Sequence, residues 1–411
     1  MRRVLFVDDD AEILEGLQQG MRRHRRKWRV ALAGGAEEAL AELAREPVDV
    51  VVSDMRMPGQ DGAALLGEIR RRHPAVIRMV LSGYAERDAS LRLVPVAHQF
   101  FSKPLTIDQL ENALERSCRL RELIGSARIR ELVGGIHNLP TAPSIYTLFN
   151  EMLARRDVNA DQVAALIGHD VALAGKLLQL ANSSFFAPAL PISSVQQAVV
   201  RLGFQLVRDL ALGAQLFDDA RRGPLPDNFS IDCLQARAAL AARLARSMLA
   251  DADGIDNHSD AATTAALLHG IGQLLLAAHH GREYAAVLEA AESDPRPLAA
   301  VERELLGASA GEVGAYLLSL WGLPLEVVEA VTHCAEPRAA EQAEMPGEFG
   351  VLGAVHAAVA LATEALPAPP GSAAVVPVAL DCDYLEQLGQ LQRLDGWREL
   401  CREHAAAGAA S

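Results

Sequence analysis

The first 120 residues alternate short β-branched runs with helical patterns, and this alternation restricts the fold more than any other feature of the chain. Apolar strands that are each followed by a helix are typical of a parallel sheet covered by helices on both faces. The predicted strands span residues 3–7, 28–33, 48–53, 77–82 and 98–102. Five such strands in a region of this length fit the flavodoxin-like doubly wound order. We therefore predict an α/β domain over residues 1–120.

Polar side chains stand at the ends of four of these strands. In strand order they are Asp8 and Asp9, then Asp54, then Ser82, and last Lys103. In open α/β sheets ligands bind beyond the carboxyl ends of the strands, so we expect these side chains to share one site. Three carboxylates in one place repel one another unless a cation accompanies them. Mg²⁺ suits such a site because it prefers oxygen ligands and bridges carboxylates to phosphoryl groups.

Four segments in order, "LFVDDD", "VVSDMRMPGQDG", "MVLSGYAE" and "FFSKPL", resemble the signature segments of the response-regulator receiver domain. The resemblance covers about residues 1–120. It implies that Asp54 accepts a phosphoryl group from a phosphohistidine on a sensor histidine kinase or a phosphotransfer protein. It also implies that Mg²⁺ is held by Asp8, Asp9, Asp54 and the backbone carbonyl of Arg56.

The same resemblance implies a conformational switch. Ser82 would hydrogen-bond a phosphoryl oxygen, Lys103 would pair with it, and Phe100 stands where the family carries its switch aromatic. Phosphorylation adds about 1.5 to 2 negative charges near pH 7, within reach of these groups. We expect the fourth helix, fifth strand and fifth helix to form the face that a downstream domain reads.

Residues 106–135 are predicted to form a long last helix that continues beyond this domain. The segment opens with a capping-box pattern, Thr106 and Gln109, and apolar residues then recur at helical spacing. The part over residues 121–135 would be a stiff helical linker, and it would also allow a homodimer. The alternative is an ordinary amphipathic last helix followed by a loop.

From residue 136 onward the sequence shows helical spacing and no strand pattern. Only 4% of the residues are aromatic, so Ala-, Leu- and Val-rich helices must build the core. The segments "LPTAPSIYTLF", "LANSSFF" with "RLGF", and "ERELLGASAGEVGAYLLSLWGLPLEVVEAV" resemble the HDOD family, an output-domain relative of the HD phosphohydrolases. The resemblance covers residues 136–335 and implies an all-helical signalling domain. Residues 336–411 are predicted to be a helical C-terminal extension with a flexible tail.

The metal-binding positions of the HD hydrolases are largely replaced in this chain. The corresponding residues are Asp232, His269, Gly270, Ala310 and His333. A metal needs three or four converging ligands, and Gly270 removes the bridging carboxylate. We therefore expect no metal and no catalytic residues in this domain, with His269 as a buried, hydrogen-bonded histidine. The alternative is a phosphorylation-regulated, metal-dependent phosphohydrolase or cyclic-nucleotide phosphodiesterase that uses His269 and His333.

The net charge of −14 disfavours binding to nucleic acid or to anionic membranes. The basic run over residues 22–29 is a local exception, either a solvated helix end and loop or a contact for an acidic partner. Five scattered cysteines indicate free thiols. No apolar stretch reaches the roughly 18 residues of a membrane span, and aspartates interrupt the apolar N-terminus. We expect a cytoplasmic signalling regulator rather than an enzyme, with a histidine kinase and an unknown protein bound to the HDOD domain as partners.

Overall fold

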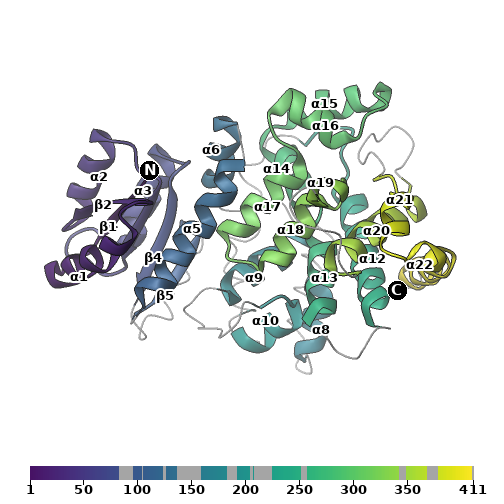
Figure 1. The fold of residues 1–411 in the computed structure, drawn as a ribbon, viewed down its shortest axis with the longest axis horizontal. Coiled ribbons are helices and arrows are strands. Elements are labelled where there is room, and N and C mark those ends of the chain that lie inside the picture. The colour runs from purple at the N-terminus through teal and green to yellow at the C-terminus, as the bar shows by residue number, and fades with distance from the viewer. Residues whose placement is uncertain are drawn as a thin grey trace. The chain divides into compact units, whose positions relative to one another are not determined.

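The computed structural model describes residues 1–82, 96–103, 105–123, 126–136, 159–182, 192–203, 207, 225–250, 257–341, 349–367 and 378–409. The chain divides into two compact units, of which the first contains Met1–His137 and the second most of the remaining chain. The first unit holds a sheet with helices, and the described part of the second consists of helices (Figure 1).

The first unit is built on one parallel sheet. Its strands are β1 (Arg2–Val7), β2 (Trp28–Ala33), β3 (Val50–Asp54), β4 (Ile77–Ser82) and β5 (Gln99–Ser102). They lie in the order β2-β1-β3-β4-β5, and every neighbouring pair is parallel. This is the flavodoxin-like order, so the predicted fold class is confirmed. Apart from Arg2, the residues of the central strands β1 and β3 are buried and most are apolar, as expected for a sheet covered on both faces.

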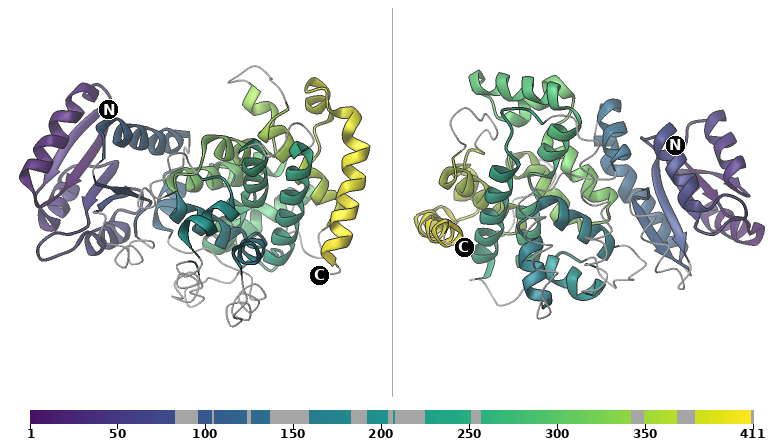
Figure 2. Two further views of the ribbon diagram at one scale, coloured as in Figure 1. Left: turned by 90° about the horizontal axis from the view of Figure 1, so that it is seen from below. Right: turned by 180° about the vertical axis from the view of Figure 1, so that it is seen from behind.

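Helices connect the strands, and some of them begin after a residue whose side chain caps them. They are α1 (Ala11–Met21), the short η1 (Arg22–His24), α2 (Ala36–Arg45), α3 (Gly62–Arg72) and α5 (Ile107–Leu123). The Asp10 and Asp61 side chains accept the first free amides of α1 and α3. Helix α1 contacts α5, whereas α2 contacts α3, as expected for helices on the two faces of a sheet. Figure 2 shows this unit, with its sheet and flanking helices, from two further sides. The predicted fourth helix falls on residues 83–95, which lie outside the described residues.

The segment after β5 forms two described helices, so the prediction of one long helix was wrong. The predicted capping box is present, because Gln109 N donates to Thr106 Oγ1 at 3.3 Å and Thr106 N donates to Gln109 Oε1 at 3.1 Å. Helix α5 ends at Leu123, and a new helix, α6 (Ala127–Gly135), starts after it. The Ser126 side chain accepts from Ile129 N at 3.3 Å, which makes Ser126 an N-cap and ends any continuity with α5.

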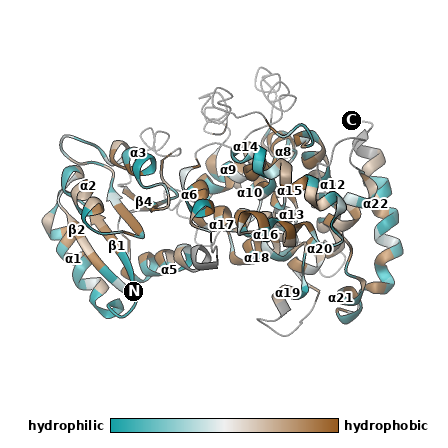
Figure 3. Cartoon of the chain, turned by 90° about the horizontal axis from the view of Figure 1, so that it is seen from above, coloured by the Kyte–Doolittle hydropathy of each residue, from teal (hydrophilic) through white to brown (hydrophobic). Residues whose placement is uncertain are grey.

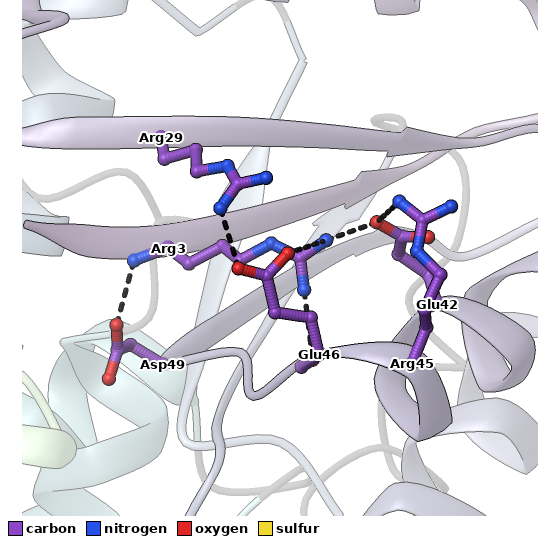
Figure 4. A network of polar contacts seen from close by, with 6 residues as sticks. All are labelled: Arg3, Arg29, Glu42, Arg45, Glu46 and Asp49. Atoms are coloured by element: carbon purple, nitrogen blue, oxygen red, sulfur yellow. Dashed lines mark hydrogen bonds and ion pairs between the residues drawn. The ribbon is translucent and has the colours of Figure 1, made fainter.

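The basic run is partly neutralised within its own unit. Arg29 lies 2.5 Å from Glu46, which also pairs with the buried Arg3 (Figure 4). Lys27 Nζ lies 2.6 Å from Glu115 Oε2 on α5. Trp28, near the end of the run, is a core residue. These contacts favour an intramolecular role for much of the run over a role as a partner surface.

The described part of the second unit is helical throughout. Its elements are α8 (Ala160–Ile167), α9 (Val171–Ala181), α10 (Val195–Leu202), α12 (Ile231–Ala250), α13 (Asn257–Leu268), α14 (Ile271–His279), α15 (Gly281–Ser293), α16 (Leu298–Leu306), α17 (Ala310–Leu320), α18 (Leu325–His333), α19 (Arg338–Glu341), α20 (Val351–Ala365), α21 (Cys382–Gln387), η5 (Leu391–Arg393) and α22 (Leu394–Ala409). Helices α12, α13, α18 and α20 pack against one another. Helix α20, coloured largely as hydrophobic in Figure 3, is buried along most of its length. The C-terminal extension therefore contributes a core helix to this unit.

Within the described residues, one stretch is long and apolar enough to cross a membrane by length and composition alone. It spans His258–His279, and 83% of its apolar window is buried inside the structure. A turn at residues 269–270 interrupts it. The core helix of a folded domain passes the same test, so this stretch is weak evidence for a membrane span.

Candidate functional site

The carboxyl ends of β1, β3 and β5 bring two predicted carboxylates and the predicted lysine together. Asp54 is the last residue of β3, while Asp8 and Lys103 directly follow β1 and β5. Lys103 Nζ lies 2.8 Å from Asp8 Oδ2 and also contacts Asp54 Oδ1. Asp8 is 3% exposed and Asp54 is 8% exposed. One ammonium group therefore links two buried carboxyl groups.

Backbone groups fix the orientation of both carboxyl groups. Arg56 N donates to Asp54 Oδ2 at 2.7 Å, and Asp10 N donates to Asp8 Oδ1 at 3.0 Å. Helix α3 begins directly beside β3 at Gly62, where an added Cβ would lie 2.2 Å from the carbonyl oxygen of Asp54. Only glycine allows this close approach of the helix to the strand.

The pKa values of Asp54 and Lys103 explain why a positive charge is needed beside the Asp54 carboxyl group. Burial raises the pKa of Asp54 above its ordinary value, while Lys103 and the Arg56 amide act in the opposite direction. Burial disfavours the Lys103 ammonium, yet its hydrogen bonds to Asp54 and Asp8 hold the pKa of Lys103 above the ordinary value. The ionised form of Asp54 therefore depends on positive charge next to it.

The other predicted residues of this site are placed less closely. Asp9 is exposed, and Phe100 is buried in the core on β5, where it pairs in register with Val80. Ser82 is the last residue of β4, and its side chain lies outside the described part of the structure. Among the described residues no three His, Cys, Asp or Glu side chains gather closely enough to hold a metal ion. The magnesium ligand set, including Asp9, therefore stays a prediction.

We expect Lys103→Met to shift the acid limb of the pH profile for phosphoryl acceptance at Asp54 to higher pH. If Asp54 is the phosphoryl acceptor, its ionised carboxylate is the nucleophile, so acceptance should fall as pH falls through the pKa of Asp54. Removing the ammonium removes the main influence that lowers this pKa and leaves burial and Asp8 to raise it. The initial rate of labelling by acetyl phosphate, measured across pH, checks this. Lys27→Met, which removes an exposed lysine paired with Glu115, serves as the control, and coincident profiles for the two variants would contradict the prediction.

The predicted degenerate positions lie on separate elements of the helical unit. Asp232 is exposed on α12, Ala310 is buried at the start of α17, and His333 ends α18. Gly270 lies in the turn before α14, and an added Cβ would lie 2.6 Å from Leu234 Cδ1. The leucine therefore fills the space in which an aspartate side chain at position 270 would begin.

His269 is held as a neutral histidine. Its Nδ1 lies 2.7 Å from the carbonyl oxygen of Ala266, so this nitrogen carries the proton and donates it. Burial, and then the charge of Arg237, lower the pKa of His269 below its ordinary value. The predicted hydrogen bond is present, although the ring is only partly buried.

The buried charged residues Arg237 and Glu302 of this unit were not predicted. Arg237 on α12 is 2% exposed and donates from Nε to the carbonyl of Leu366 at 2.7 Å. Glu302 on α16 accepts from Tyr284 Oη at 3.0 Å and from Ala310 N at 2.7 Å, and burial raises the pKa of Glu302 to about 7. In the sequence both residues occupy helical positions that read as ordinary surface charge, so no local pattern distinguishes them.

Comparison with known proteins gives two family matches, one for each type of domain. The response regulator receiver domain matches residues 4–115, and the HDOD domain matches residues 139–337. The hydrogenase transcriptional regulatory protein HoxA of Cupriavidus necator is 34% identical over 124 residues, which is 30% of this chain and 25% of HoxA. The transcriptional regulatory protein ZraR of Salmonella typhimurium is 28% identical over 153 residues, which is 36% of this chain and 34% of ZraR. The chain thus spans between a quarter and about a third of the length of these curated relatives.

One of the similar solved structures is a response regulator. The MmoQ response regulator from Methylococcus capsulatus str. Bath is 26% identical, with a TM-score of 0.48, and the match covers 62% of this chain and 97% of the MmoQ chain. The sheet order, the paired carboxyl groups at its edge and the two family matches lead to the same assignment. The chain belongs to the two-component response regulators and carries a receiver domain followed by an HDOD domain.

Proposed function

We propose that Asp54 accepts a phosphoryl group from a sensor histidine kinase or a phosphotransfer protein in the cytoplasm. We further propose that this modification switches the protein–protein contacts of a catalytically inactive HDOD domain. The observation that carries the proposal is the arrangement at the sheet edge, in which Lys103 contacts both Asp54 and Asp8. A buried aspartate that is oriented by a backbone amide and faced by an ammonium group suits nucleophilic attack on phosphorus.

For the phosphoryl transfer, the protein mainly has to position the Asp54 carboxylate and to provide positive charge beside it. A carboxylate oxygen of Asp54 forms a bond to phosphorus as the bond from phosphorus to the imidazole nitrogen of the donor breaks. Lys103 already contacts Asp54 Oδ1, so it is placed to pair with the incoming phosphoryl oxygens. Ser82 ends the strand next to β3, which suits a hydrogen bond to the same group.

Magnesium fits this site because the donors are oxygens and because Asp8 and Asp54 already share one cationic group. Asp8, Asp9, Asp54 and the carbonyl of Arg56 would hold the ion. When bound, it supplies charge neutralisation beside the acceptor. Ser82 and Phe100 lie on adjacent strands, so drawing Ser82 towards the phosphoryl group would change the packing around Phe100.

One contact and one electrostatic effect support the inactivity of the HDOD domain. Leu234 occupies the space next to Gly270, and the positive charge of Arg237 acts on His269. A cationic side chain near a candidate ligand opposes the binding of a divalent metal ion. Metal analysis of the purified protein and turnover assays on cyclic dinucleotides would detect the alternative, a hydrolase that uses His269 and His333.

An affinity pull-down tests the output. We expect the wild-type protein, with and without acetyl phosphate, to capture different amounts of at least one partner. The Asp54→Ala variant should behave as the unphosphorylated protein under both conditions. Identical capture by the wild type in both states would contradict phosphorylation-gated partner contacts.

A further inference from the structure

A buried arginine lies near the start of β4. Arg78 is 1% exposed, and its guanidinium group donates to backbone carbonyl oxygens from several parts of the receiver domain. The distances are 2.6 Å to Val96, 3.0 Å to Val76, 3.3 Å to Pro74 and 2.5 Å to Gly134. Gly134 lies near the end of α6. Arg78, a residue of the sheet, therefore binds a backbone carbonyl group of that helix.

A histidine next to β5 supports the same attachment. The His98 side chain is buried, and its Nδ1 accepts from Arg78 N at 3.0 Å. Its Nε2 lies 2.9 Å from Arg78 Nη2 and 3.3 Å from the carbonyl oxygen of Gly134. Side chains associated with two adjacent strands therefore converge on one carbonyl of α6.

The attachment depends on the absence of a side chain at position 134. An added Cβ on Gly134 would lie 2.0 Å from the carbonyl oxygen of Pro74, which lies two residues after the end of α3. An added Cβ on the neighbouring Gly135 would lie 3.6 Å from Pro74 Cβ, an ordinary van der Waals distance. Helix α6 also packs against α3. A methyl group would therefore clash with the backbone at position 134 but would fit at position 135.

We propose that Arg78 is a positioning residue that couples the phosphoryl-acceptor site to the segment leading to the HDOD domain. Strand β4 carries Arg78 near its start and Ser82 at its end. Likewise, His98 directly precedes β5 and Lys103 directly follows it. The two strands that present predicted phosphoryl-sensing groups at one end thus hold α6 at the other.

As a consequence, α6 moves together with the receiver domain and does not act as a flexible linker. A displacement of β4 and β5 on phosphorylation reaches the chain that leads to the HDOD domain through Arg78 and Gly134. This inference rests on the proposed function, because it requires phosphorylation at Asp54 to displace these strands.

Hydrogen exchange on the full-length protein tests the coupling. Wild type, Gly134→Ala and Gly135→Ala are compared before and after treatment with acetyl phosphate and Mg²⁺. We expect Gly134→Ala to speed amide exchange in α6 by roughly tenfold to a hundredfold, as expected for loss of one or two charge-assisted hydrogen bonds. Labelling of Asp54 should be unchanged, and the response of the HDOD peptides to phosphorylation should be lost. Gly135→Ala should match the wild type.

A second variant, Arg78→Lys, keeps the charge but cannot reach the same set of carbonyls, and it should give the same result without a steric clash. Retention of a wild-type HDOD response in both Gly134→Ala and Arg78→Lys would overturn the coupling role and leave the proposed function intact. A wild-type protein that is labelled at Asp54 but shows no HDOD response would overturn the proposed output, and the coupling with it.

Discussion

Asp54→Asn is expected to abolish covalent labelling by acetyl phosphate and Mg²⁺, with a loss of roughly a hundredfold or more. The amide keeps the size and most contacts of the side chain but has no anionic oxygen to attack phosphorus. It also has one acceptor oxygen where the carboxylate has two, and the carboxylate uses both, towards Lys103 and towards the Arg56 amide. Intact-mass measurement of the protein after incubation, followed by peptide mapping, quantifies the modification.

A matched control comes from the same edge of the sheet. Asp61 caps α3, where its Oδ1 accepts from Ala64 N at 2.8 Å. Asparagine caps helices about as well as aspartate, so Asp61→Asn should leave both the fold and the labelling intact. Undiminished labelling of Asp54→Asn would show that another residue is the acceptor, and the assignment of the site would then fail.

Gly272→Ala is expected to destabilise the HDOD domain by about 3 kcal/mol or more. A Cβ on Gly272 would lie 1.9 Å from the carbonyl oxygen of Ala310 and 2.8 Å from the amide nitrogen of Gly314. These are backbone atoms of α17, so relief of the overlap requires the two helices to separate. Separation would expose apolar residues of α14 that are fully buried, such as Leu275.

Thermal and chemical unfolding of the full chain measure the effect. Gly396 on α22 provides the control, because a Cβ there would meet nothing within 4 Å. Gly396→Ala should change stability little, and in the stabilising direction, since alanine is the better helix former by about 1 kcal/mol. Equal stability of the two variants would contradict the close helix contact.

The sequence by itself predicted the α/β sheet and the residues at its carboxyl edge. Alternation of strands and helices is a local property, and each strand carries its polar residue at its own end. Once the strands are parallel, their carboxyl ends meet at one edge, so Asp8, Asp54 and Lys103 lie together as predicted. No knowledge of long-range packing was needed for this result.

The end of α5 and the course of α6 required the structure. Helical spacing continues through residues 106–135 in the sequence, and it favoured one uninterrupted helix. The Ser126 cap and the attachment of Gly134 to Arg78 make the second part a separate helix within the first compact unit. A local hydrophobic pattern reports which face of a helix is apolar, but not the surface against which that face packs.

The surroundings of polar residues were decided by tertiary structure alone. Arg78 is one polar residue within an apolar strand, yet it is buried because carbonyl groups up to 56 residues away in the chain accept its hydrogen bonds. Leu234 and Arg237 reach the turn at Gly270 from a different helix. The free energy of burying a polar or charged group depends on which partners surround it, and these partners come from distant segments that only the folded chain brings together.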